Sequence, residues 1–273
     1  MKSPVGHAHQ LQITVSIGDF SPLFRKPEFL FRGLENTGID GIELWVGMKS
    51  RWTTVHYTKL AKQYGLPIVS LHQPLWAMTG LYFDEDFFRL GQKLRVQHIT
   101  CHPLPGISLT SKRMREYFKR LAAIQERIGI PILIENLPQA YRNGLLHHFF
   151  PPASDTADVL RICAAASEFG LGITLDTDHV YLPDPHSQAW FKEVLPRVGN
   201  IHLSSFAKGR RHLPPYLGDL QATEFVDYLH TQKYAQTVTL EIGWPKAITT
   251  LDYDFETVRK SVAFLRKAKG TSL

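Results

Sequence analysis

The chain has 273 residues, 44% of them hydrophobic, a composition typical of a globular protein and of neither a fibrous nor a disordered one. No stretch approaches the length of a membrane span, and the N-terminal segment lacks the apolar core of a secretory signal. With only two cysteines, Cys101 and Cys163, we expect a cytoplasmic protein with no membrane partner. The formal charge of +6 favours an anionic substrate such as a sugar phosphate over nucleic acid.

Short β-rich runs alternate with longer amphipathic segments along the whole chain. We expect strands near residues 11–17, 41–46, 67–72, 98–102, 131–135, 172–176, 199–204 and 238–242. Helices are expected near 27–37, 52–65, 84–96, 111–129, 154–170, 186–197, 222–233 and 253–269. This alternation predicts an α/β fold, a (β/α)8 TIM barrel that forms a single domain over residues 1–273. An open doubly wound sheet is the competitor, but no G-x-G-x-x-G motif follows the first strand.

Six consecutive predicted strands end on a residue that binds metals or transfers protons. In chain order these residues are His72, His102, Glu135, Asp176, His202 and Glu241. The C-terminal ends of the strands of a TIM barrel form one rim, where enzymes of this fold carry their chemistry. One such residue alone would be interpreted as a buried polar group with ordinary hydrogen-bond partners. Six in succession predict a metal site.

The side chains two positions earlier point the same way, because side chains alternate along a strand. They are Ser70, Thr100, Leu133, Thr174, Asn200 and Thr239, and all but the leucine are small or polar. The pattern predicts a polar layer beneath the rim. By the same alternation, Cys101 should point outward into the packing between strands and helices.

Further candidates lie in the segments that follow the strands. Trp45 and Trp76 could stack on a sugar ring or simply pack, and the sequence favours neither. The basic cluster KGRRH at 208–212 places Arg210 and Arg211 close to the predicted rim, where they could bind a phosphate. The long segment at 137–155 is interpreted as a lid or as a contact in a homo-oligomer.

The motifs TGIDGIELW, ILIENLP, ITLDTDHVYL, NIHLSS and TLEIGW together resemble the xylose isomerase-like barrel superfamily. That superfamily includes ketose epimerases, hydroxypyruvate-type isomerases, inosose-processing enzymes and endonuclease IV, and the resemblance covers essentially the whole chain. It implies a divalent ion (Mn, Zn, Mg or Co) held by Glu135, Asp176, His202 and Glu241. It also matches His179 to a histidine that binds substrate or metal in the family.

The resemblance implies two alternative chemistries. In the isomerase or epimerase, Glu135 and Glu241 are the catalytic bases, which remove and return a proton through an enediolate of a sugar, sugar phosphate or small hydroxy-ketone. In an endonuclease IV-like enzyme, two or three zinc ions hold a phosphodiester of abasic DNA and activate water. A third alternative is a non-catalytic metal-bound barrel subunit, against which the presence of both glutamates argues.

The additional histidines resemble the endonuclease pattern in part. His72, His102 and His212 match zinc histidines of that enzyme, and His72 and His102 are generally missing from simple epimerases. Arg210, however, stands where the endonucleases have an aspartate, and a guanidinium cannot ligate a metal. We therefore expect one or two ions per chain, with His72, His102, His179 and His212 available for a second ion or for substrate. The isomerase or epimerase is the favoured function.

Overall fold

The computed structural model describes residues 11–18, 27–45, 51–73, 85–104, 107–137, 156–180, 191–207, 210–219, 222–242 and 251–267. At 51–55, 156–158, 210–211 and 251–254 only the backbone is described.

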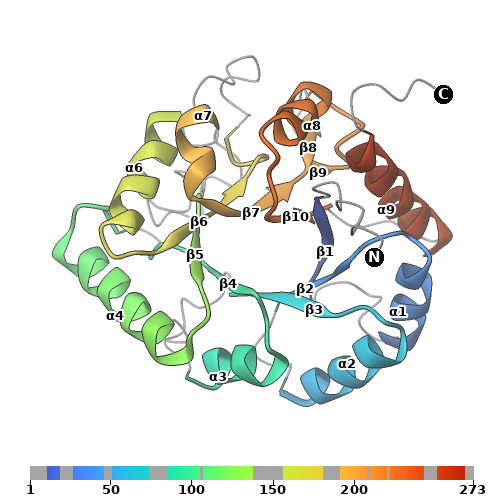
Figure 1. Ribbon diagram of the computed structural model, residues 1–273, viewed down its shortest axis with the longest axis horizontal. Helices are drawn as coiled ribbons and strands as arrows, with labels where there is room; N and C mark the ends of the chain where they lie inside the picture. The colour runs from blue at the N-terminus through green and yellow to red at the C-terminus, as the bar shows by residue number, and fades with distance from the viewer. Residues whose placement is uncertain are drawn as a thin grey trace, which may run out of the picture.

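Parallel strands close into a barrel in the order β1-β10-β7-β6-β5-β4-β3-β2 (Figure 1). The strands are β1 (Gln12–Gly18), β2 (Gly41–Trp45), β3 (Ile68–His72), β4 (His98–Cys101), β5 (Ile132–Glu135), β6 (Gly172–Asp176), β7 (Val198–Leu203) and β10 (Thr237–Leu240). Each lies within about two residues of its expected position. The prediction of a (β/α)8 TIM barrel is confirmed.

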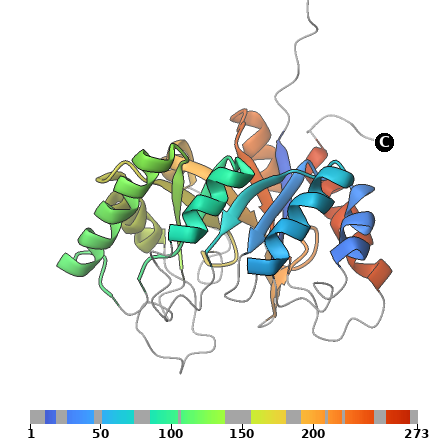
Figure 2. The same cartoon turned by 90° about the horizontal axis from the view of Figure 1, so that it is seen from below.

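Helices surround this barrel on its outside, as Figures 1 and 2 show from two directions. They are α1 (Pro27–Glu35), α2 (Arg51–Gln63), α3 (Glu85–Leu94), α4 (Lys112–Ile128), α6 (Thr156–Ser167), α7 (Phe191–Val194), α8 (Ala222–Thr231) and α9 (Leu251–Arg266), and a 3-10 turn (Leu195–Arg197) follows α7. The longest, α4, shows how the sequence sets both ends. Ser111 caps its N-terminus by accepting the Met114 N–H at 3.2 Å, and Gly129 ends it in the left-handed conformation, with φ of 67°. None of the helices in the described ranges is long and apolar enough to cross a membrane.

A two-stranded antiparallel hairpin, β8 (Ser205–Ala207) and β9 (Arg210–Leu213), follows β7 and was not predicted. The sequence showed only a basic cluster here. The hairpin brings β9 back toward the end of β10. There the Nδ1 atom of His212 lies 3.2 Å from the carbonyl oxygen of Glu241.

The barrel interior is polar, as the alternation of side chains predicted. The Thr100 and Thr174 hydroxyls lie 2.8 Å apart, and Thr239 donates to the Asn200 side chain at 2.9 Å. Leu133 is the bulky exception, and a Cβ on Gly172 would approach it to 2.6 Å, so the missing side chain makes room for the leucine. The outward residues form the apolar core with the helices, and Cys101 is among them with no exposed surface.

Candidate metal centre

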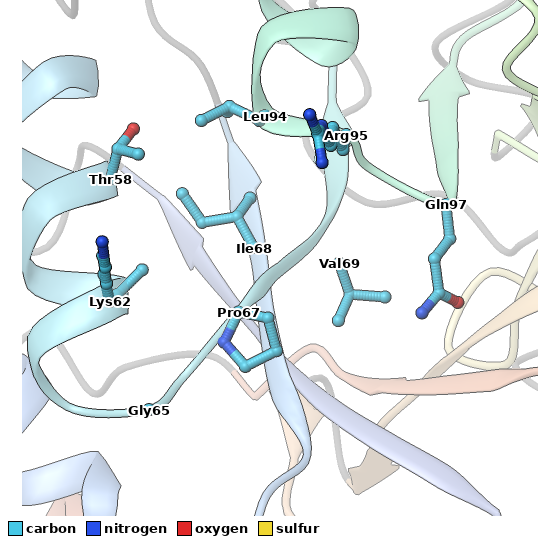
Figure 3. Close-up of a pocket in the computed structure, with 10 residues that line it drawn as sticks. Thr58, Lys62, Gly65, Pro67, Ile68, Val69, Leu94, Arg95 and Gln97 are labelled. Carbon is cyan, nitrogen blue, oxygen red and sulfur yellow. The ribbon is translucent and has the colours of Figure 1, made fainter.

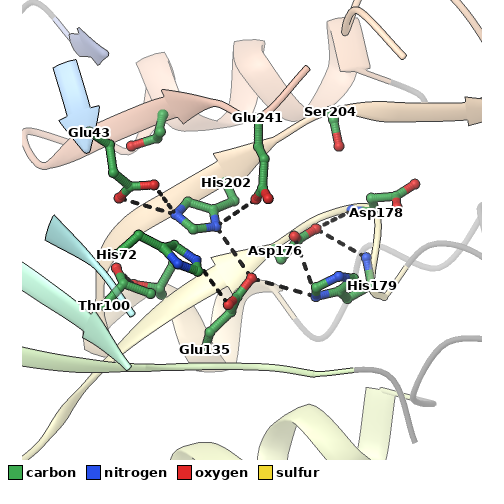
Figure 4. Close-up of polar contacts among 12 residues, drawn as sticks. Glu43, His72, Thr100, Glu135, Asp176, Asp178, His179, His202, Ser204 and Glu241 are labelled. Carbon is green, nitrogen blue, oxygen red and sulfur yellow. Dashed lines mark hydrogen bonds and ion pairs between the residues drawn. The ribbon is translucent and has the colours of Figure 1, made fainter. Parts of the chain in front are cut away.

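Four of the predicted ligands converge at one rim of the barrel. Glu135 ends β5, Asp176 ends β6, His202 lies in β7 and Glu241 follows β10 directly, so four neighbouring strands each contribute one side chain. One ligand atom from each residue lies within 4.8 Å of the others. Figure 4 shows the four side chains pointing toward one another. Three carboxylates and one imidazole in this arrangement could hold a divalent cation.

His202 is the centre of this group. Its Nδ1 atom lies 2.8 Å from Oε2 of Glu241 and 3.3 Å from Oε1 of Glu135. Burial lowers the pKa of His202, but Glu43 and Glu241 outweigh it and raise the pKa well above the ordinary value. Without a cation, the ring is therefore held as an imidazolium between carboxylates. Since a metal would bind the same Nδ1 atom, metal and proton compete for one position.

A second group shares Glu135 with the first. His102 Nε2 lies 2.7 Å from Oε2 of Glu135, and His72 Nε2 lies 3.3 Å from the same oxygen. The three side chains are almost fully buried, and their ligand atoms also fall within 4.8 Å of one another. Glu135 could thus bridge two cation positions. The number of ions per chain stays a prediction.

Backbone carbonyls fix the ring orientation of three histidines. The Nδ1–H groups of His72, His179 and His212 donate to the carbonyl oxygens of Gln73, Asn136 and Glu241, at 2.9, 2.8 and 3.2 Å. A carbonyl only accepts, so each Nδ1 carries the proton and, in the neutral ring, Nε2 keeps its lone pair. Such outer contacts prepare histidines for metal binding. His212 is half-buried, and its Nε2 atom lies 3.7 Å from Oδ2 of Asp178.

Asp176 lies close to three other carboxylates. Burial, together with Glu241, Glu135 and Asp178, raises its pKa well above the ordinary value. Its Oδ1 atom accepts the N–H groups of Asp178 and His179 at 2.8 and 3.1 Å, which leaves Oδ2 for another partner. The Asn136 side chain holds the Asp176 backbone at both its N–H and its carbonyl, at 2.7 and 3.0 Å. The ENL motif thus joins the ends of β5 and β6.

The chemistry of the donor set fits a divalent cation. Within the described residues, the ion-pair partners of Glu135, Asp176 and Glu241 are all histidines. In the same part of the chain, the buried atoms Oε2 of Glu135, Oδ2 of Asp176 and Oε2 of Glu241 make no well-aligned hydrogen bond, although imidazole nitrogens lie 2.7, 3.3 and 2.8 Å from them. Several carboxylates out of water, with imidazoles as their only counter-charges, are costly unless a cation neutralises them.

Two buried residues of this interior were missed in the sequence. Glu43 in β2 has no exposed surface, and its carboxylate contacts the side chains of Ser70, Asn200 and His202. His98 at the start of β4 is also buried, which lowers its pKa from 6.5 to about 4. The available signal for Glu43 was an acid in the middle of a strand that the barrel buries on both faces.

The other predicted site residues have different outcomes. Trp45 is half-buried: its indole N–H donates to the Gln73 carbonyl at 3.0 Å, and its ring stands edge-on to His72 with centroids 5.2 Å apart. It therefore packs beside the second group of ligands. Trp76 and the side chains of Arg210 and Arg211 lie outside the described residues, and the segment expected as a lid or an oligomer contact is described only at Leu137.

A groove of about 440 Å³ lies at the opposite end of the barrel, between α2 and α3 (Figure 3). Lys62, Pro67 and Arg95 are among its lining residues, and the backbone there leads into β3 and β4. Because the predicted ligands lie at the other ends of these strands, this groove is no part of the metal centre.

The sequence profile of the xylose isomerase-like TIM barrel matches residues 31–268, most of the chain. The chain belongs to this family. No curated protein sequence matches it significantly. Among solved structures, the 3-keto-D-glucoside 4-epimerase from E. coli is 17% identical, with 94% of this chain and 99% of that one covered and a TM-score of 0.67.

Two further solved structures of the fold have different described functions. A D-allulose 3-epimerase from Methylomonas sp. is 16% identical, covering 94% of this chain and 97% of its own, with a TM-score of 0.66. An AP endonuclease, family 2, from Brucella melitensis is 16% identical, covering 88% and 95%, with a TM-score of 0.65. At these identities the similarity establishes the fold and does not select a reaction.

Proposed function

We propose that the protein is a divalent-metal-dependent isomerase or epimerase of a sugar, a sugar phosphate or a small hydroxy-ketone. The observation that carries this proposal is the pair Glu135 and Glu241, which flank Asp176 and His202 around one cation position. Epimerases among the solved structures of this fold agree with it. The positive formal charge of the chain suits a phosphorylated substrate.

The two glutamates differ in their exposure to solvent. Glu135 is buried and shared by histidines, whereas the Glu241 side chain keeps 20% of its surface exposed. A divalent cation at this site would polarise the substrate carbonyl and stabilise the enediolate. One glutamate, as carboxylate, takes the proton from the carbon beside the carbonyl, and the other, as carboxylic acid, delivers a proton to the enediolate. Return to the opposite face of the same carbon gives the epimer, and return to the neighbouring carbon gives the isomer.

Solvent exchange tests this proposal. The protein loaded with Mn²⁺ or Co²⁺ would be incubated in D₂O with a panel of ketoses and ketose phosphates, and the products examined by NMR. We expect deuterium at the carbon next to the carbonyl, and loss of exchange in both Glu135→Gln and Glu241→Gln. Turnover without deuterium incorporation would contradict the enediolate and indicate hydride transfer or hydrolysis.

An endonuclease IV-like phosphodiesterase is the second candidate, and one observation favours it. His72 and His102 join Glu135 in a second buried group of ligands, which an enzyme with one ion does not need. Two ions that share a carboxylate suit phosphodiester hydrolysis. Nicking of an abasic-site duplex by the zinc-loaded protein, without exchange on any sugar, would select this function. Metal binding with neither activity would leave the non-catalytic barrel.

A further inference from the structure

Glu43 reaches across the barrel interior to the central histidine of the metal centre. Its strand, β2, is separated from β7 by β1 and β10, so no ladder contact brings the two residues together. The Nε2 atom of His202 nevertheless lies 3.1 Å from Oε1 and 3.3 Å from Oε2 of Glu43 (Figure 4). Neither residue has any exposed surface. A carboxylate and an imidazole are thus held in contact away from water.

The two nitrogens of the His202 ring point at different groups. Nδ1 points at Glu241 and Glu135, where the cation would lie, and Nε2 points at Glu43. A ring nitrogen that carries a hydrogen cannot ligate a metal, so the neutral ring serves only with its hydrogen on Nε2. We propose that Glu43 is a positioning residue of the metal centre: it accepts the Nε2–H of His202 and so directs the Nδ1 lone pair at the cation. This role rests on the metal centre of the proposed function.

The carboxylate of Glu43 is itself held in place. The Ser70 hydroxyl donates to its Oε2 at 3.0 Å, and the Asn200 amide donates to the same atom at 3.4 Å. The Asn200 side-chain amide cannot flip without losing a hydrogen bond, because Thr239 donates to its carbonyl oxygen at 2.9 Å. Residues of β3, β7 and β10 therefore fix the direction from which Glu43 meets His202. A metal-bound histidine that donates its other N–H to a carboxylate is a recurrent arrangement, which keeps the ring in the binding tautomer.

Replacement of Glu43 by glutamine should reverse this preference. Two donors, from Ser70 and Asn200, point at the Oε2 position, so the amide oxygen of the variant belongs there. Its NH₂ group then takes the Oε1 position, 3.1 Å from Nε2 of His202, while the Oε2 position, 3.3 Å from Nε2, becomes a neutral amide oxygen. A donor beside Nε2 and a weaker acceptor both favour the tautomer with the hydrogen on Nδ1, in which the ligand atom is blocked.

Co²⁺ alone serves as the probe, and binding is measured by competition with a chromophoric chelator. For Glu43→Gln we expect 10–100-fold weaker Co²⁺ binding, the usual effect of losing such an outer contact, with an unchanged number of ions per chain. Thr14→Val is the matched control. It removes a buried hydrogen bond of 2.8 Å between Thr14 and Thr239 in the same interior, and Thr239 keeps Asn200 as a partner. The control should bind Co²⁺ as tightly as the wild-type protein.

Two results would overturn the positioning role. Equal Co²⁺ affinity in Glu43→Gln and wild-type protein would mean that Glu43 only fills the interior. One ion fewer per chain would make Glu43 itself a ligand, since Glu43, His72 and His202 also offer atoms within 4.8 Å of one another. If the glutamine variant does not fold, Ser70→Ala replaces it and should weaken Co²⁺ binding several-fold, with equal affinity again counting against the proposal. The Co²⁺ assay does not depend on turnover. Failure to exchange sugar protons would therefore contradict the proposed reaction but not the positioning role of Glu43.

Discussion

Asp176→Asn should change stability in opposite directions in the metal-free and metal-loaded protein. Burial and neighbouring carboxylates raise the pKa of Asp176 well above its ordinary value, so the folded metal-free state binds this proton more tightly than the unfolded state. That contribution to stability is present at low pH and falls as pH rises toward the folded pKa. Asparagine cannot ionise, and at pH 8 the metal-free variant should be at least as stable as the wild-type protein.

The loaded protein should behave differently, because Asp176 offers one of four ligand atoms within 4.8 Å of one another. A cation at 1,000 times its Kd stabilises the folded state by about 4.1 kcal/mol. If loss of one ligand weakens binding about 100-fold, the same concentration is only about 10 times the Kd of the variant and gives about 1.4 kcal/mol. The difference, about 2.7 kcal/mol, should lower the Tm of the loaded variant by about 5–10 °C relative to the loaded wild type.

Thermal unfolding with excess chelator and with excess Mn²⁺ or Zn²⁺ measures both changes. Glu116→Gln, on the exposed face of α4, provides a matched loss of one carboxylate charge and should show neither effect. A variant that loses the same stability with chelator and with metal would refute the reasoning, because Asp176 would then support the fold and not a cation.

Two further predictions concern the interior and the hairpin. Burial lowers the pKa of His98 from 6.5 to about 4. Between these two values the folded ring is neutral, whereas the ring in the unfolded chain is protonated. The metal-free protein should therefore lose up to about 3 kcal/mol of unfolding free energy from this residue as the pH falls through that range. In His98→Asn, the difference between urea unfolding free energies at pH 7 and pH 4.5 should shrink accordingly, and an unchanged difference would contradict the assignment. Arg210→Asp should add one zinc ion per chain, as measured by elemental analysis. The control Arg211→Asp makes the same charge change at the next position of β9 and should add none. Equal zinc counts in the two variants would show that Arg210 does not limit metal binding.

The strands and the rim could be predicted because their signals are local. Each strand is a short β-rich run, and strand alternation alone assigns Ser70, Thr100 and Thr174 to the interior, where the structure has them. Strand ends in a closed parallel barrel share one rim, so adjacent strands bring Glu135, Asp176, His202 and Glu241 together without any further information.

Glu43 could not be assigned by the same reasoning, because its partner is set by closure of the barrel. Contact between β2 and β7 depends on how far each side chain reaches across the interior, and no spacing in the sequence encodes this. The hairpin of β8 and β9 could not be predicted for another reason. Strands of three and four residues are too short to show an alternation of apolar and polar residues. Its effect on the site, the contact of His212 with the Glu241 carbonyl, therefore became visible only in three dimensions.

The carbonyl oxygens that anchor His72, His179 and His212 have a consequence for how this rim can vary among related chains. A main-chain oxygen is present whatever amino acid occupies the position, so a substitution at Gln73 can leave the anchor of His72 intact. An insertion or deletion that shifts the backbone beside a strand end removes the anchor even when every histidine is kept. Among distant relatives of this fold, the length of these connections should therefore tell more about whether the histidines can bind metal than the identity of the residues between them.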